Sequence, residues 1–210
     1  MYIKPEELEQ VQWEPTSYCN ANCLVCPRTD KETMLSQPNI VHTQRHSNDG
    51  DIQSFVDSVV DPRLHSLKRI VYNGNIGDAM MHPKIDKILI RVDQQRPSVT
   101  QTLHTNGGGP WADKFEKIGS YISQHNPDSN IHLVFSVDGL EDTNHLYRRN
   151  VKFETAINNA QAFIRAGGKA QWNFIVFKHN QHQIKNARTL SKLVGFEDIL
   201  FRGKIGRAHV

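Results

Sequence analysis

Cysteine is scarce in this chain of 210 residues: there are three, all between positions 19 and 26. An uneven number of clustered thiols cannot pair off into a disulfide framework, and such frameworks belong to oxidising compartments. No apolar run approaches the roughly 20 residues that a membrane helix needs, and the start, MYIKPEELEQ, lacks the basic-then-apolar layout of a signal peptide. These absences predict a cytoplasmic protein that does not enter a membrane, and they favour metal binding by the cysteines.

A large excess of one charge is absent too. Charged residues make up 22% of the chain and hydrophobic residues 38%, with a formal net charge of +3. This composition argues against disorder and against a protein that coats nucleic acid, so we expect no nucleic-acid partner. The length suits one domain with a substantial core. Phosphate-loop motifs, a Ser-His-Asp set and a carboxylate pair are also missing, and we assign no catalytic residue.

Beyond the cysteines, short apolar segments alternate with longer segments of helical period. The short segments predict six strands, at 11–14, 69–73, 99–105, 131–137, 172–177 and 198–202. The longer ones predict five helices, near 51–60, 83–94, 111–125, 152–166 and 182–194. This alternation is typical of βα units around a parallel sheet or barrel. Residues 29–48 are polar and without clear period, which predicts a long loop after the first strand.

The last seven residues, KIGRAHV at 204–210, interrupt the connection expected after the sixth strand. They match an in-frame translation of a common sequencing-library adapter. We therefore interpret 204–210 as an adapter scar and residues 1–203 as the domain, and we expect a natural protein that is longer. On this interpretation the chain is truncated at its C-terminus, the last helix of the fold is missing, and the fragment could be inactive.

The three cysteines have the spacing C-x3-C-x2-C, as Cys19, Cys23 and Cys26. Short gaps on an irregular segment let three thiolates converge on one soft metal centre. Structural zinc sites usually close with a fourth ligand, whereas an open site keeps a position for substrate or cofactor. Two interpretations follow: a non-catalytic protein with a Cys3His zinc site, completed by a histidine such as His42 or His46, or an open metal centre.

With the alternating elements behind it, the cysteine motif resembles that of the radical S-adenosylmethionine (radical SAM) family. Tyr18 before the first cysteine and the sequence CPR at 26–28 are similar to peptide-modifying members, some of which carry SPASM-type C-terminal domains. The resemblance extends from about Val11 to Arg202. It implies an α/β fold, a partial (β/α)6 TIM-like barrel, in which the three cysteines hold three irons of a [4Fe-4S] cluster. The fourth iron is then chelated by S-adenosylmethionine (SAM).

The resemblance also implies an enzyme activity. In the family, an external one-electron donor such as a flavodoxin or ferredoxin reduces the cluster, SAM is cleaved, and a 5′-deoxyadenosyl radical abstracts hydrogen from a substrate. Among the substrates of such enzymes, a peptide or protein is favoured here by the similarity to peptide-modifying members.

Several later turns resemble the family's cofactor-binding segments. NGNIGDAMMHP at 73–83 follows the second strand and is similar to a Gly-rich turn that binds the SAM amino group, with Asp where Glu is common. LHTNGG at 103–108, FSVDG at 135–139 and NHLYRRN at 144–150 resemble other segments of the site. The cofactor-binding residues that the resemblance implies are Gly74, Gly77, Asp78, Asn106, Ser136, Asp138 and Arg148.

Each implied residue also has an ordinary interpretation. By resemblance Ser136 and Arg148 hold the SAM carboxylate or ribose and Asp138 supports the site, but single matches of this kind are common turns. Asp78 fits an ordinary strand-to-helix turn in which its carboxylate caps a helix. His104, inside a strand, is expected to be packed or hydrogen bonded. The order of the segments is the stronger argument, because all of them follow strands, and barrel enzymes build their sites at the carboxyl ends of strands.

Overall fold

One parallel sheet of six strands forms the frame of the molecule, seen in a computed structural model that describes residues 3–30, 45–72 and 76–203. The order of strands in the sheet follows the chain. The strands are β1 (Gln10–Trp13), β2 (Arg69–Tyr72), β3 (Thr100–Thr105), β4 (Ile131–Ser136), β5 (Lys169–Ile175) and β6 (Asp198–Arg202). The predicted α/β fold with parallel strands is confirmed.

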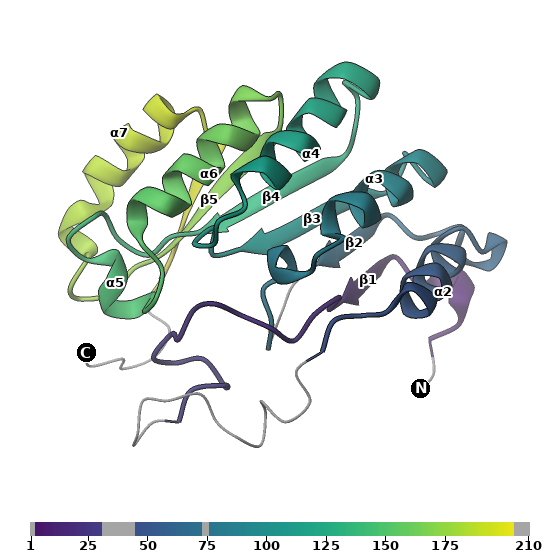
Figure 1. The fold of residues 1–210 in the computed structure, drawn as a ribbon, viewed down its shortest axis with the longest axis horizontal. Coiled ribbons are helices and arrows are strands. Elements are labelled where there is room, and N and C mark those ends of the chain that lie inside the picture. The colour runs from purple at the N-terminus through teal and green to yellow at the C-terminus, as the bar shows by residue number, and fades with distance from the viewer. Residues whose placement is uncertain (1–2, 31–44, 73–75, 204–210) are drawn as a thin grey trace.

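Helices connect the strands and cover one face of the sheet. They are α2 (Asp49–Val59), α3 (Ile85–Gln95), α4 (Ala112–His125), the short α5 (Asn144–Tyr147), α6 (Phe153–Arg165) and α7 (Ile184–Val194). Short 3₁₀ turns occur at η1 (Pro5–Glu7), η2 (Pro62–Leu64), η3 (Ala79–Met81) and η4 (Gln181–Gln183). Figure 1 shows α3, α4, α6 and α7 side by side on the same face. At the edge, Phe55 of α2 stacks on Trp13 of β1 with ring centroids 3.8 Å apart.

The hydrophobic core lies between the sheet and these helices because side chains alternate between the two faces of a strand. In β5, Ala170, Trp172 and Phe174 are buried against the helices, while Gln171 is exposed on the opposite face. The predicted start of the fifth strand at residue 172 was therefore wrong by three residues, because β5 begins at Lys169. Polar residues alternate with apolar ones in the first three residues of β5, so they do not form an apolar run.

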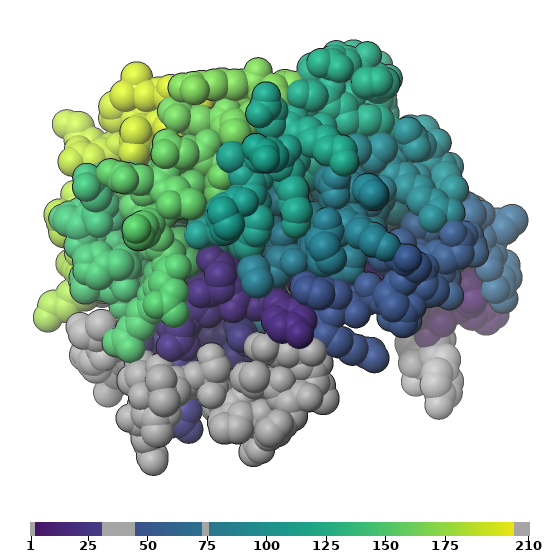
Figure 2. Space-filling view, in the orientation of Figure 1, coloured from purple at the N-terminus to yellow at the C-terminus, as the bar shows by residue number. Residues whose placement is uncertain are grey.

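The segment of residues 14–30, which carries the cysteines, crosses from β1 toward α5 at the carboxyl ends of the strands. In the space-filling view it lies, in purple, between the green α5 region and the blue residues that precede α2 (Figure 2). No helix within the described ranges is long and apolar enough to cross a membrane. The proposed adapter scar, 204–210, lies outside the described residues.

Candidate functional site

A cavity of about 470 Å³ lies between the cysteine segment and the carboxyl ends of the central strands. All three cysteines line it. Of the cofactor-binding residues implied by sequence, five line the same cavity: Gly77, Asp78, Asn106, Ser136 and Arg148. Asp138 supports it from behind through Arg148, whereas Gly74 lies outside the described residues. The structure thus brings the cysteines, which follow β1, together with implied residues that end or follow β2, β3 and β4.

Backbone contacts hold the cysteine segment across the strand ends. The N–H of Asp78 donates to the carbonyl of Tyr18 at 2.7 Å, and the N–H of Asn22 donates to the carbonyl of Arg149 at 3.0 Å. At Gly77 the approach is so close that a Cβ would lie 2.0 Å from the carbonyl oxygen of Thr16. Glycine at this position therefore allows the backbone after β2 to touch the backbone of the cysteine segment.

The substitution Gly77→Ala is expected to lower the free energy of unfolding by about 1–3 kcal/mol, because the new methyl overlaps backbone atoms that cannot rotate away. Urea unfolding followed by circular dichroism measures the change. Gly203→Ala is the matched control, since a Cβ there meets nothing within 4 Å. Equal stabilities for the two variants would contradict the close contact with Thr16.

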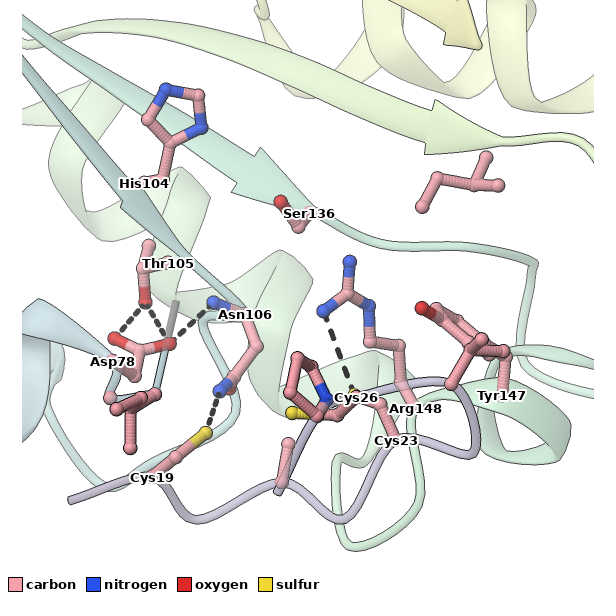
Figure 3. Close-up of a pocket in the computed structure, with 16 residues that line it drawn as sticks. Cys19, Cys23, Cys26, Asp78, His104, Thr105, Asn106, Ser136, Tyr147 and Arg148 are labelled. Carbon is pink, nitrogen blue, oxygen red and sulfur yellow. Dashed lines mark hydrogen bonds between the residues drawn. The ribbon is translucent and has the colours of Figure 1, made fainter. Parts of the chain in front are cut away.

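Asp78 is buried, and both of its carboxylate oxygens accept hydrogen bonds from the protein. Oδ1 accepts from the N–H of Met80 at 3.0 Å. Oδ1 also accepts from Thr105 Oγ1 at 2.9 Å, and Oδ2 accepts from the N–H of Asn106 at 2.7 Å (Figure 3). Burial raises the pKa of Asp78, and these hydrogen bonds oppose that rise. Asp78 is the N-cap of η3, which confirms the capping interpretation. Its contact with the SAM amino group stays a prediction.

Asn106 links the end of β3 to the first cysteine. Its Nδ2 donates to Asn20 Oδ1 at 2.9 Å and lies 3.8 Å from Cys19 Sγ, while its Oδ1 accepts from the N–H of Gly108 at 2.7 Å. The amide is therefore fixed in orientation by three contacts, with its N–H group beside a sulfur. Hydrogen bonds to sulfur are one of the means by which a protein sets the potential of an iron–sulfur cluster.

The buried Asp138 and the partly buried Arg148 form an ion pair behind the second cysteine. Arg148 Nε donates to Asp138 Oδ2 at 2.6 Å, and Arg148 Nη1 donates to Cys23 Sγ at 3.7 Å. Asp138 is fully buried, and its Oδ1 accepts from the N–H of Ile175 at 2.6 Å. Burial works against the Arg148 charge, yet the neighbouring carboxylate raises the pKa of Arg148 above its ordinary value. Arg148 is thus a permanent cation held between a carboxylate and a thiol.

The thiols are the ligand type of an iron–sulfur site, but they are not gathered around one point, and burial favours the protonated form of Cys19 and Cys23. Burial raises the pKa of Cys19 to about 12, with a smaller effect from Asp78, and burial also raises the pKa of Cys23. In Figure 3 the Cys19 sulfur points to Asn106 and the Cys23 sulfur to Arg148. No three His, Cys, Asp or Glu side chains of the described residues are arranged to hold a metal ion. Three thiols on one cavity wall nevertheless supply the ligand type that such clusters use.

The histidines proposed for a zinc site differ in their surroundings. The Nδ1 atom of His46 lies 2.8 Å from Thr16 Oγ1, and its ring packs on Tyr18 with centroids 4.5 Å apart. His46 thus pairs with Thr16, at the start of the cysteine segment, in an isolated antiparallel bridge. It is not among the described residues that line the cavity. His42 lies outside the described residues.

Sequence reasoning missed some residues of the cavity wall. Thr105 and Tyr147 each directly precede an implied residue, so the motifs contained the signal for them. His104 also lines the cavity and is half-buried, and in the described part of the chain no hydrogen bond to its ring is found. The expectation that His104 is simply packed or hydrogen bonded inside the sheet was therefore incomplete.

Comparison with known proteins supports the fold. No protein-family model matches the chain, and no curated protein matches it by sequence. Among solved structures, Streptococcus suis SuiB bound to S-adenosylmethionine matches 93% of this chain with a TM-score of 0.67 at 17% identity. The enzyme anSMEcpe with bound AdoMet matches 93% with a TM-score of 0.66 at 15% identity. Methylornithine synthase (PylB) matches 93% with a TM-score of 0.60 at 7% identity.

These three proteins are radical SAM enzymes, and the chain has the radical SAM core fold. The predicted partial TIM-like barrel is thereby confirmed. The chain spans 40% of the length of SuiB, 51% of anSMEcpe and 53% of PylB.

Proposed function

We propose that this chain is the core of a radical SAM enzyme in which Cys19, Cys23 and Cys26 hold a [4Fe-4S] cluster and SAM occupies the cavity beside them. One observation carries the proposal: on a radical SAM core fold, all three cysteines of the chain line a single cavity together with Asp78 and Arg148. A structural zinc site needs no such cavity of polar strand ends. The thiols and the strand-end residues together form a place for a ligand as well as a metal.

The residues of the cavity suit the groups of SAM. Arg148 keeps N–H donors in addition to those directed at Asp138 and Cys23, and a guanidinium group matches a carboxylate. Ser136 lines the same wall and adds a hydroxyl. Asp78 lines the same cavity with a carboxyl group, which in its ionised form accepts a charge-assisted hydrogen bond from an ammonium group. When bound, the cluster and SAM supply reductive cleavage of the sulfonium and a 5′-deoxyadenosyl radical.

A peptide or protein is the proposed substrate, and a flavodoxin- or ferredoxin-like protein the proposed electron donor. Structures of SuiB with the precursor peptide SuiA and of anSMEcpe with the Cp18Cys peptide show that proteins of this fold bind peptides. Both of these chains are longer than the present one. The proposal for this chain therefore concerns the core that would bind SAM and generate the radical.

Anaerobic reconstitution with iron and sulfide tests the proposal. We expect a brown, air-sensitive protein with about four irons, and we expect the triple variant Cys19→Ala, Cys23→Ala, Cys26→Ala to stay colourless. Reduction with dithionite in the presence of SAM is then expected to release 5′-deoxyadenosine. A colourless protein that retains one zinc per chain would contradict the proposal. Cluster assembly without release of 5′-deoxyadenosine would contradict the proposed SAM cleavage by this chain and leave the cluster site in place.

A further inference from the structure

A second cavity, of about 360 Å³, lies on the face of the sheet that the helices leave uncovered. His104 lines both this cavity and the one beside the cysteines, so the two adjoin. In Figure 3 the His104 ring projects from its strand, away from the cysteines. A group bound in the second cavity would therefore lie next to the proposed SAM site.

The wall of the second cavity is polar where barrel interiors are ordinarily apolar. The side chains that face away from the helices include Thr102, His104 and His132 on β3 and β4, and Asn173 on β5. Branched apolar residues dominate the same positions of filled parallel barrels. Hydroxyl, imidazole and amide groups at these positions need a hydrogen-bonding partner, which is water or a polar ligand.

The cavity is also cationic. Arg69 and Arg202 line it, and no acidic side chain of the described residues does. Arg202 Nε donates to Asn173 Oδ1 at 3.2 Å, an arrangement that leaves the terminal N–H groups of Arg202 without an ion-pair partner in the described chain. His132 differs, because Glu197 lies 3.9 Å from its Nδ1. The end of the cavity near Arg202 is therefore the part that lacks a counter-charge.

Three donor groups on β3, β5 and β6 line this cavity: His104, Asn173 and Arg202. Burial lowers the pKa of His104, and the charge of Arg202 lowers it further. The neutral form of the ring is therefore favoured, and a neutral imidazole donates one N–H. The Oδ1 atom of Asn173 accepts a hydrogen bond from Arg202, and its Nδ2 group donates to no atom of the described residues. Two kinds of neutral donor beside a guanidinium fork are a set that suits a carboxylate, which accepts several hydrogen bonds and carries one negative charge.

We propose that Arg202, Asn173 and His104 form a carboxylate-binding subsite that anchors an acidic side chain or the C-terminus of the peptide substrate beside the SAM cavity. This inference rests on the proposed function, because only a radical SAM enzyme acting on a peptide would make the bound carboxylate part of its substrate. Arg202 lies on β6 and Asn173 on β5, and His104 lines both this cavity and the cavity of the cysteines. A peptide held at Arg202 would thus extend toward the proposed site of radical formation.

Binding of small peptide analogues to the chain tests the subsite without any cluster. The probes are N-acetylglutamate N-methylamide, its neutral isostere N-acetylglutamine N-methylamide, N-acetylalanine with a free carboxylate, and inorganic phosphate. Their binding is followed by NMR through the His104 ring signals and the Arg202 Nε–H signal. We expect the carboxylate probes to shift these signals and the neutral isostere to leave them unchanged. Arg202→Gln is expected to weaken carboxylate binding about tenfold.

Arg188→Gln is the matched control, because it removes the same charge as Arg202→Gln. Arg188 lies over the ring of Phe201, which is on the opposite face of β6 from Arg202. Equal weakening by both variants, equal shifts from the acid and its isostere, or phosphate binding more tightly than the carboxylates would each overturn the proposal. Tight binding of only the glutamate probe, or only of N-acetylalanine, supports it and identifies the source of the carboxylate. Carboxylate binding in a chain that assembles no cluster would refute the proposed function while leaving the subsite in place.

Discussion

Arg148→Met is expected to lower the free energy of unfolding by about 3–5 kcal/mol near pH 7, since it removes the cationic partner of the buried Asp138 carboxyl group. Asp138 is fully buried, and its Oδ2 has Arg148 Nε at 2.6 Å as its charged partner. Methionine fills much of the volume of the arginine stem, so the loss reports mainly the charge and not a cavity. Chemical unfolding at several urea concentrations measures the difference.

Arg149→Met, the same change one residue later, is the control. Arg149 is partly exposed, and its side chain forms no ion pair in the described structure, so its replacement is expected to stay within about 0.5 kcal/mol of the parent protein. A loss at Arg148 no larger than the loss at Arg149 would show that the buried pair contributes nothing to stability.

The deficit of Arg148→Met is expected to depend on pH. Burial raises the pKa of Asp138 above its ordinary 3.8, and the Arg148 charge opposes that rise. A carboxyl whose pKa is higher in the folded than in the unfolded protein loses folding stability as pH rises from the unfolded value through the folded one. Without Arg148 the folded pKa of Asp138 lies higher still. The difference between variant and parent should therefore be larger near pH 7 than near pH 5.

The fold was predictable from sequence because each element contains its own signal. Apolar alternation located β3 and β4 to within a residue, and the left-handed Gly195, with a φ of 99°, ends α7 where a C-terminal glycine predicts an end. The start of β5 was missed because the polar residues Lys169 and Gln171 break the apolar run, and Gln171 lines the polar cavity. The polar face that hid a strand boundary is the one on which the carboxylate subsite is proposed.

The site was predictable as a set of residues but not as a set of contacts. Asp138 and Arg148 were both nominated from turn motifs, yet their ion pair depends on α5 folding back over the cysteine segment, which no local pattern encodes. Arg202 and Asn173 lie on different strands, and only the register of β5 against β6 brings them together. Local motifs therefore identified which residues gather, while tertiary structure decides which of their donors remain free.

Asp78 is the position at which motif and structure suggest different emphases. The resemblance assigns its carboxylate to the SAM amino group, whereas the structure shows both oxygens occupied by Met80, Thr105 and Asn106. A carboxylate oxygen can accept more than one hydrogen bond, so the two roles are compatible. The two roles predict different effects of replacing Asp78 by its neutral isostere asparagine. Loss of a ligand contact weakens SAM binding, whereas loss of a structural role, here called the brace, lowers the stability of the fold.

Asp78→Asn is expected to lower the free energy of unfolding by about 2–4 kcal/mol, even though the side chain keeps its shape. In either orientation the new NH₂ group faces a backbone N–H, that of Met80 or that of Asn106, and one buried donor is left without an acceptor. Asp128→Asn is the control, because Asp128 is exposed in a loop.

Asp78→Glu extends the test, since glutamate is the common residue of the family's motif. Asp78 is buried, so an added methylene is expected to cost about 1–3 kcal/mol by overpacking, although both acceptors are retained. Urea unfolding and equilibrium SAM binding, measured on all three variants, separate the two roles. If Asp78→Asn folds as stably as Asp128→Asn but no longer binds SAM, the brace is refuted and the ligand contact stands. Loss of stability in Asp78→Asn establishes Asp78 as the residue that fixes the end of β3 against the cysteine segment.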